Sequence, residues 1–211
     1  MSKALIFYTN PQSRGNIVHW MLEEIGQPYE TRVLEMGTTM KAPEYLGINP
    51  MGKVPAIRHG DVVVTEAAAI CAYLADAFPE AGLAPALAER GDYYRWLFFA
   101  AACAEPAMSD HATGWHCDTA ELQRQFGYGS FEQAFDNLAG WLAGRSYVAG
   151  DGFSAADVYV ASLLSFGMGF NLIPRKPEFE AYVAPLLARS AKKRADARIA
   201  ELMAESAPAF I

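Results

Sequence analysis

Apolar residues near the start of the chain follow two different patterns. Residues 4–8 form an unbroken apolar run, which is typical of a strand buried on both faces. In residues 14–25 the apolar side chains recur every three or four positions, and Gly26 suits a helix end. Residues 29–34 predict a second strand. A strand, a helix and a strand within about thirty residues indicate a βαβ unit with parallel strands.

The next segment predicts a hairpin and a further helix. Residues 36–49 are mostly polar and are expected to hold one short helix. Residues 56–58 and 62–65 are expected to form two strands joined by a tight turn. Residues 67–77 carry apolar side chains on one helical face. The predicted order of this α/β part is therefore βαβ followed by ββα.

Only helical patterns follow, so the second part is expected to be all-α. We place one domain at residues 1–78, a Pro- and Gly-containing linker at 79–90 and a helical domain at 91–211. Pro106 is expected to end or kink the helix that precedes it. The expected helices cover residues 87–103, 131–142, 154–166, 179–187 and 191–204, and residues 111–118 are left unassigned.

Ser154 and Asp157 stand three residues apart at the start of one of these helices. A Ser followed by an acidic residue at this spacing is the pattern of a capping box. We interpret Asp157 as a structural residue at a helix start in the core.

Composition restricts the class of protein. The chain has 211 residues, of which 52% are hydrophobic and 19% charged, so one domain or two small ones can bury an ample core. The net charge of −7 argues against a nucleic-acid partner. No window of about 18 uncharged apolar residues predicts a membrane span. The apolar start is too short for a signal peptide, so we expect a cytoplasmic protein.

The three cysteines, Cys71, Cys103 and Cys117, show neither a CxxC motif nor zinc-ligand spacing. Cys71 and Cys103 lie in apolar helical patterns, where burial is the simplest interpretation. Cys117 is next to His116 and Asp118, but these residues are too few for a closed metal site. We therefore expect no metal.

Residues 49–57 and 65–70 suggest a binding site. In the first stretch, Asn-Pro-Met-Gly-Lys leads to Val54-Pro55 and a short strand. A cis bond before Pro55 would turn the backbone groups of Val54 outward, where an extended peptide could pair with them. Glu66 begins a helix, and free N–H groups at a helix start suit a ligand carboxylate.

These motifs, with Ser13-Arg14 and Phe153–Asp157, give the chain a resemblance to the glutathione transferase family over almost its full length. Residues 22–30 look bacterial and somewhat phi-like or beta-like. The resemblance implies a thioredoxin-like N-terminal domain followed by a helical domain, with glutathione as co-substrate. It also implies a homodimer.

By this resemblance, Ser13 is the hydroxyl donor that stabilises the glutathione thiolate. A free thiol has a pKa near ~8.5, and a donor at a helix N-terminus lowers that value. Asn10 and Tyr8 are rival donors, and Ser13 could instead be a plain helix cap.

The resemblance also assigns contacts to glutathione. The backbone of Val54, before a cis Pro55, pairs with the cysteinyl unit. Glu66 and the N–H of Ala67 meet the γ-glutamyl end. The resemblance also implies that Lys41 and Lys53 bind a carboxylate. Each lysine could equally be a solvated surface charge. Many family members have Ser where this chain has Ala67, a change that removes one hydroxyl contact worth about 1–3 kcal/mol.

The electrophile is expected to be a small hydrophobic compound held by the helical domain. Candidate lining residues are Phe98, Met108, Trp115 and Phe170, although aromatic residues at helical spacing also suit a core. The leading hypothesis is transfer of the glutathione sulfur to an electrophilic carbon. Peroxide reduction or isomerisation on the same site is an alternative, and a non-catalytic partner-binding module is another.

Overall fold

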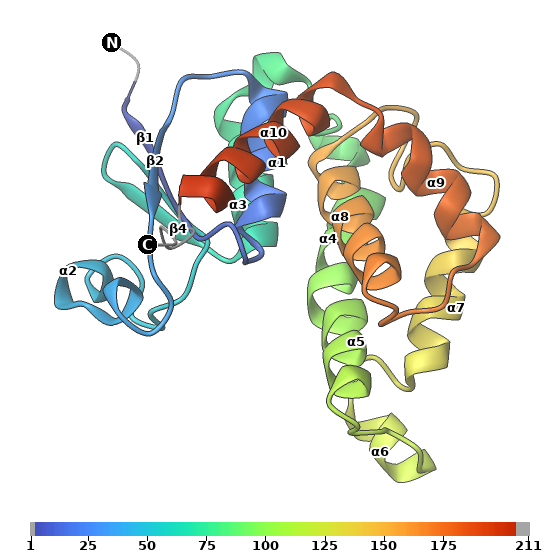
Figure 1. Ribbon diagram of the computed structural model, residues 1–211. Helices are drawn as coiled ribbons and strands as arrows, with labels where there is room; N and C mark the ends of the chain where they lie inside the picture. The colour runs from blue at the N-terminus through green and yellow to red at the C-terminus, as the bar shows by residue number, and fades with distance from the viewer. Residues whose placement is uncertain (1–2, 206–211) are drawn as a thin grey trace. The chain divides into compact units, whose positions relative to one another are not determined.

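The computed structural model describes residues 3–205 and divides them into two compact units (Figure 1). The first unit comprises residues 3–81 together with residues 189–205. The second unit comprises residues 82–188. Each unit has its own core and is described by itself.

The first unit contains a four-stranded sheet in the order β2-β1-β3-β4. β1 pairs in parallel with β2, whereas β3 is antiparallel to both β1 and β4. The strands are β1 (Leu5–Thr9), β2 (Glu30–Val33), β3 (Ala56–His59) and β4 (Val62–Thr65). The parallel βαβ unit and the hairpin predicted from the sequence are confirmed.

The two faces of this sheet carry different elements. On one face, Phe7 meets His19 of α1 (Gly15–Ile25), and α3 (Ala67–Ala77) packs beside α1. On the other face, Ile6 and Tyr8 pack with Met40 and Tyr45. These last two residues belong to the 3-10 turn Thr39–Lys41 and to α2 (Pro43–Leu46), which replace the single short helix expected there.

The last helix, α10 (Ser190–Glu205), belongs to the first unit, whereas the helical domain was predicted to cover residues 91–211. The helix packs along α1 (Figure 1). Arg189 forms two hydrogen bonds with Glu24, at 2.7 and 2.8 Å, and Arg194 Nε lies 2.8 Å from Glu23 Oε2. The acidic pair on α1 therefore attracts the basic start of α10, which corrects the predicted boundary.

The second unit is helical, with no strand among its described residues. A continuous helical stretch runs from α4 through a π-helical turn into α5. The elements are the 3-10 turn Leu87–Glu89, α4 (Gly91–Phe99), the π turn Ala100–Ala104, α5 (Glu105–Ala112), α6 (Ala120–Gln125), α7 (Phe131–Leu142), α8 (Ala155–Gly169) and α9 (Pro177–Leu187).

Two details of this unit differ from the expectation. The helix predicted over residues 87–103 begins only at Gly91, and of the two outcomes expected at Pro106, an end or a kink, the end does not occur. Proline lacks the N–H that would bond to the carbonyl four residues earlier, and the π turn lies just before Pro106. In addition, α6 was not predicted; Thr119 caps it by accepting a hydrogen bond from the amide of Leu122.

The predicted capping box at the start of α8 is confirmed. Asp157 is fully buried, and its Oδ2 accepts hydrogen bonds from the amide and the hydroxyl of Ser154, at 2.8 and 2.9 Å. Its Oδ1 accepts from the Val148 amide and the Tyr182 hydroxyl, each at 2.7 Å. Burial raises the pKa of Asp157, while these donors act to lower it. The residue is therefore a structural centre of the second unit.

Candidate functional site

The strand register brings three loops to the same end of the sheet. Tyr8, near the end of β1, pairs with Ala56 at the start of β3, which pairs with Thr65 at the end of β4. The turn after β1, the segment before β3 and the start of α3 therefore meet at one end. These three segments contain most of the residues predicted to contact glutathione.

The turn between β1 and α1 is held by the Ser13 side chain. Its hydroxyl donates to the carbonyl of Asn10 at 2.6 Å and accepts from the amide of Gly15 at 3.0 Å. A Cβ atom on Gly15 would lie 2.0 Å from Oγ1 of the buried Thr9, so only glycine fits there. Ser13 thus stands just before the helix, with its single proton directed to a backbone carbonyl.

The two rival donors lie in different surroundings. Asn10 uses Nδ2 to donate to the carbonyl of Leu34 at 2.8 Å. Tyr8 points to the opposite sheet face from Phe7 and lines a cavity of about 410 Å³ together with Arg32 and Tyr45. None of the residues lining that cavity, apart from Tyr8 itself, is a predicted glutathione contact.

Val54 precedes a cis peptide bond to Pro55, as the resemblance implies. Within residues 3–205, neither the N–H nor the C=O of Val54 has a hydrogen-bond partner. The carbonyl before it, on Lys53, accepts from the Tyr45 hydroxyl at 2.6 Å and from Asn49 Nδ2 at 2.8 Å. The segment is therefore fixed by its neighbours while the Val54 backbone stays available to a ligand.

The two lysines of the prediction lie in the same loop region. Lys41 Nζ donates to the carbonyl of Met51 at 3.0 Å, and its side chain covers Gly52. Gly52 has a φ of 57°, and a Cβ there would lie 2.8 Å from the Met40 carbonyl oxygen. Lys53 is exposed, and its ammonium has no partner among the described residues.

Glu66 has an unusual backbone conformation at the start of α3. Its φ of 67° lies in a region that side chains other than glycine rarely adopt, at a cost of about 1–3 kcal/mol. Its carboxylate is exposed and has no ion-pair partner in the described part of the chain. The next residue, Ala67, is buried and opens the helix, where the first amides lack helical acceptors.

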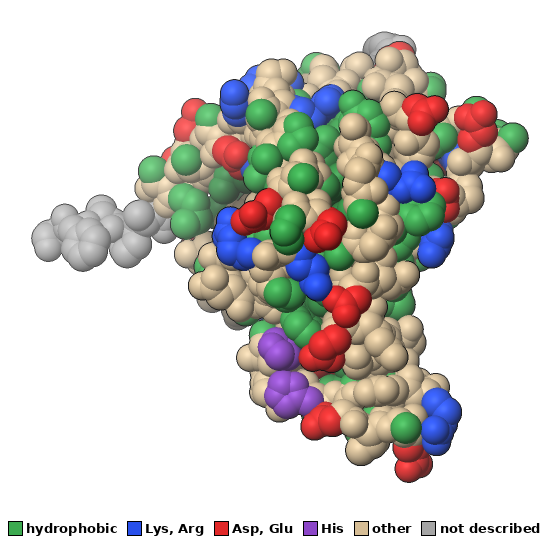
Figure 2. All heavy atoms as spheres, turned by 90° about the vertical axis from the view of Figure 1, so that its right-hand side faces the viewer, with side chains coloured by type: hydrophobic (Ala, Val, Ile, Leu, Met, Phe, Trp, Pro, Cys, Tyr) green, Lys and Arg blue, Asp and Glu red, His purple; other side chains and the backbone are tan. Residues whose placement is uncertain are grey.

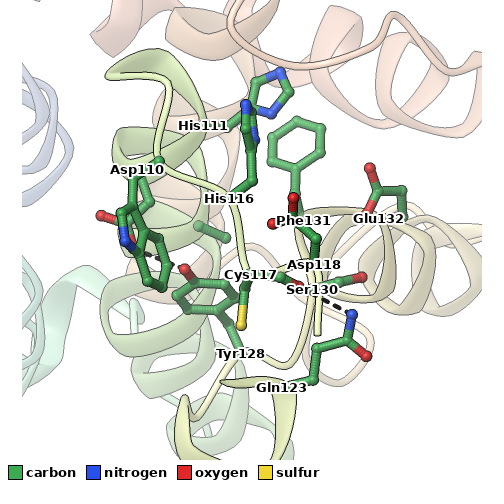
Figure 3. A pocket seen from close by; sticks show the side chains of 12 residues that line it. Asp110, His111, His116, Cys117, Asp118, Gln123, Tyr128, Ser130, Phe131 and Glu132 are labelled. Carbon is green, nitrogen blue, oxygen red and sulfur yellow. Dashed lines mark hydrogen bonds between the residues drawn. The ribbon is translucent and has the colours of Figure 1, made fainter. Parts of the chain in front are cut away.

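The four predicted electrophile-lining residues lie in different surroundings. Met108 is buried, with its sulfur near Gly167. Phe98 and Phe170 are each 68% exposed. Trp115 lines a cavity of the second unit, shown in Figure 3.

Among the described residues, no group of three or more His, Cys, Asp or Glu side chains is arranged to hold a metal ion. The cysteines are all free thiols. Burial raises the pKa of Cys71 to about 12, and it also raises the pKa of Cys103 and Cys117. A raised pKa leaves little thiolate near neutral pH, which does not favour nucleophilic chemistry at these residues.

Two features escaped the sequence reasoning. Tyr45 holds the Lys53 carbonyl, and no motif points to it because it lies in a short polar helix. The hydrogen bond between Tyr128 and Asp110 helps to shape the cavity of Figure 3. The only sequence signal for that cavity is the density of His and aromatic residues in the unassigned segment.

Comparison with known proteins identifies the family. A family model described as the N-terminal domain of glutathione S-transferase matches residues 15–77, and one described as the C-terminal domain matches residues 129–189. A glutathione S-transferase of Xanthomonas campestris pv. campestris is 31% identical over 164 residues, or 72% of this chain and 78% of that protein. The chain belongs to the glutathione S-transferase family.

Solved structures agree with this assignment of the glutathione S-transferase fold. The crystal structure of a glutathione transferase from Methylococcus capsulatus is 29% identical, with a TM-score of 0.77, and the match covers 94% of this chain and 100% of that one. A sphingomonad glutathione S-transferase complexed with glutathione is 26% identical, with a TM-score of 0.74 and coverage of 92% and 98%. In the described part of this family member, no helix is long and apolar enough to cross a membrane.

Proposed function

We propose that this protein binds glutathione at the end of the sheet where the three loops meet, and that it transfers the glutathione sulfur to a small hydrophobic electrophile. The observation that carries the proposal is the free backbone of Val54 beside residues that fix it. An extended peptide can pair with such a segment as an added strand. The glutathione bound in the sphingomonad relative supports the ligand class.

The other contacts follow from the chemistry of glutathione. The γ-glutamyl end carries an ammonium and a carboxylate. Glu66 would meet the ammonium, and the first amides of α3, beginning with Ala67, would meet the carboxylate. Lys53 and Lys41 would meet the glycyl carboxylate, although Lys41 must then share its ammonium with the Met51 carbonyl.

In the proposed reaction, the bound thiol loses its proton to solvent. The sulfur then uses its electron pair to form a bond to the electrophilic carbon. In a substitution, the leaving group departs with the pair from the bond that breaks. Ser13 would stabilise the thiolate by turning its hydroxyl proton from the Asn10 carbonyl to the sulfur.

A binding module without catalysis is the second candidate. The Ser13 proton is directed to the Asn10 carbonyl, and Ala67 supplies no hydroxyl. If the hydrogen bond to Asn10 persists when glutathione binds, the thiol keeps an ordinary pKa. The protein would then hold glutathione without activating it.

Calorimetric titration of reduced glutathione at several pH values separates the two candidates. The variants are Ser13→Ala, Glu66→Gln and the matched control Glu80→Gln, an exposed acid of the same unit. For a transferase, wild type and Glu80→Gln bind glutathione and release close to one proton near neutral pH. Ser13→Ala binds without that release, and Glu66→Gln binds about tenfold or more weakly.

Binding without proton release by wild type would favour the module. Absence of binding by wild type would refute both candidates. Activity with a panel of electrophiles, including a peroxide, then identifies the reaction type.

We further propose that the protein is a homodimer, as its family membership suggests. β4 is an edge strand, and Val62 and Val63 on it are 42% and 40% exposed. Apolar side chains on an open edge suit contact with a second copy. Sedimentation equilibrium of wild type and of Val63→Lys tests this: the wild type should have twice the chain mass, and the variant should dissociate more readily.

A further inference from the structure

The second unit contains a cavity of about 310 Å³ that the proposed transferase does not use (Figure 3). It is bounded by the end of α5, the segment before α6 and the start of α7. Its volume is at the lower end of the range found for small-molecule sites. All of its lining residues belong to the second unit, so it is formed independently of the loops that meet at the sheet.

Aromatic side chains form the walls of this cavity. The ring of His111 stacks on Phe131 with centroids 4.0 Å apart and an angle of 15°, and His116 meets His111 edge-on at 5.3 Å. Trp115 and Tyr128 contribute further rings. Figure 3 shows His111 and Phe131 facing each other, with His116 alongside. Ring faces carry partial negative charge and attract cations.

Apart from the two histidines, the charged side chains of the lining are acidic. Asp110, Asp118 and Glu132 line the cavity, and none of the described lining residues is Lys or Arg. Asp110 accepts the Tyr128 hydroxyl at 2.7 Å, whereas Asp118 and Glu132 have no partner among the described residues. In the view of Figure 2, histidine side chains lie at the lower left with acidic side chains close by, and Lys and Arg side chains lie above them and at the lower right.

Two other polar side chains of the cavity are already engaged. Gln123 donates to the carbonyl of Cys117 at 2.9 Å, and Ser130 caps α7 in a capping box with Gln133. The side chains of the lining without a hydrogen-bond partner among the described residues include the carboxylates of Asp118 and Glu132 and the ring nitrogens of His111, His116 and Trp115.

We propose that this cavity binds a small organic ammonium ion. Its positive centre would lie against the ring of Trp115, within reach of Asp118 and Glu132. The combination of aromatic faces and carboxylates is the chemistry that recognises alkylated ammonium groups. An anion of the same size would instead meet the three acidic side chains Asp110, Asp118 and Glu132.

Two probes of the same shape test the role of charge. One is the (2-hydroxyethyl)trimethylammonium ion, and the other is its uncharged carbon isostere, 3,3-dimethylbutan-1-ol. Each is titrated into the full-length ¹⁵N-labelled protein near pH 8 while the indole N–H signals are recorded by NMR. The chain has four tryptophans, and the Trp115 signal is identified by its loss in Trp115→Phe. Trp115 is 39% exposed, so this variant should fold.

The cation should shift the Trp115 signal and leave the other indole signals in place. We expect about fivefold or greater weakening for the neutral isostere and for Asp118→Asn or Glu132→Gln. The matched control is Glu121→Gln, an exposed acid on α6 outside the cavity, and it should bind like wild type. The result should be the same with and without glutathione, so it does not depend on the proposed transferase.

Three results would overturn the proposal. Equal affinity for the isostere would mean that charge has no role. Equal weakening by Glu121→Gln would indicate diffuse attraction to an acidic surface. No shift of the Trp115 signal at any cation concentration would mean that the cavity does not bind this class.

Discussion

His19 should make the stability of the first unit depend on pH. The side chain is fully buried, and its ring meets Phe7 edge-on with centroids 4.7 Å apart. Neither ring nitrogen has a hydrogen-bond partner among the described residues. The pKa of His19 is lowered from 6.5 to about 4, mainly by burial; Arg198 contributes to this lowering, and Glu23 opposes it.

The direction of the effect follows from the two protonation states. Above pH 6.5 the imidazole of His19 is neutral in both the folded and the unfolded chain, and it contributes no pH dependence. As the pH falls toward about 4, the unfolded chain gains a proton that the folded chain does not accept, so stability is lost. Below about pH 4 both states are protonated and the loss levels off. The difference between a pKa of 6.5 in the unfolded chain and about 4 in the folded chain corresponds to a loss of about 3 kcal/mol in the free energy of unfolding.

Urea denaturation of wild type and His19→Leu at several pH values between about 7.5 and 4 measures this loss. Leucine keeps an apolar side chain at the site and removes the titration. The wild type should lose about 3 kcal/mol more than the variant over this interval. His116→Leu, at an exposed histidine, is the matched control and should follow wild type. Parallel pH profiles for wild type and His19→Leu would refute the reasoning.

Three further predictions concern buried contacts, each measured by urea denaturation unless stated. Asp157→Ala leaves four donors without an acceptor and should cost at least about 3 kcal/mol, whereas Asp157→Asn, which keeps one acceptor oxygen, should cost less. Gly15→Ala forces a Cβ against the Thr9 hydroxyl and should cost about 1–3 kcal/mol, part of which the added change Thr9→Ala should restore. Tyr45→Phe removes one hydrogen-bond donor from the Lys53 carbonyl and should cost about 1 kcal/mol of stability. Calorimetry should also show weaker glutathione binding by this variant. Unchanged binding would contradict the role of Tyr45 in positioning the Val54 segment.

The sheet and the main helices could be predicted because local patterns determine them. The unbroken apolar run of β1 and the helical spacing of α1 reflect burial within each element. The capping box of Ser154 and Asp157 is a contact between residues three apart, so the sequence alone contains it.

The docking of α10 could not be predicted in the same way. Its ion pairs join Glu23 and Glu24 to arginines more than 160 positions later, Arg194 being 171 positions from Glu23. A charged helix face fits solvent as well as it fits a partner of opposite charge. Only the packed structure decides between the two.

The candidate glutathione site shows a similar limit. The motifs around Val54 and Glu66 were visible because proline, glycine and glutamate stand at fixed spacing. The direction of a hydroxyl proton and the free state of a backbone amide leave no trace in the sequence. The hydrogen bond from Ser13 to Asn10 and the unpaired groups of Val54 therefore appear only in the structure.

In the proposed function, binding and activation of glutathione depend on different groups. Binding relies on backbone groups and charges that are already free, namely those of Val54, Lys53 and Glu66. Activation relies on one hydroxyl, that of Ser13, which must first give up a 2.6 Å hydrogen bond to a carbonyl. That exchange costs little if the thiolate accepts a stronger, charge-assisted hydrogen bond in return. Thiolate formation and rotation of the Ser13 hydroxyl should therefore occur together, which is why proton release is the measurement that distinguishes a transferase from a binding module.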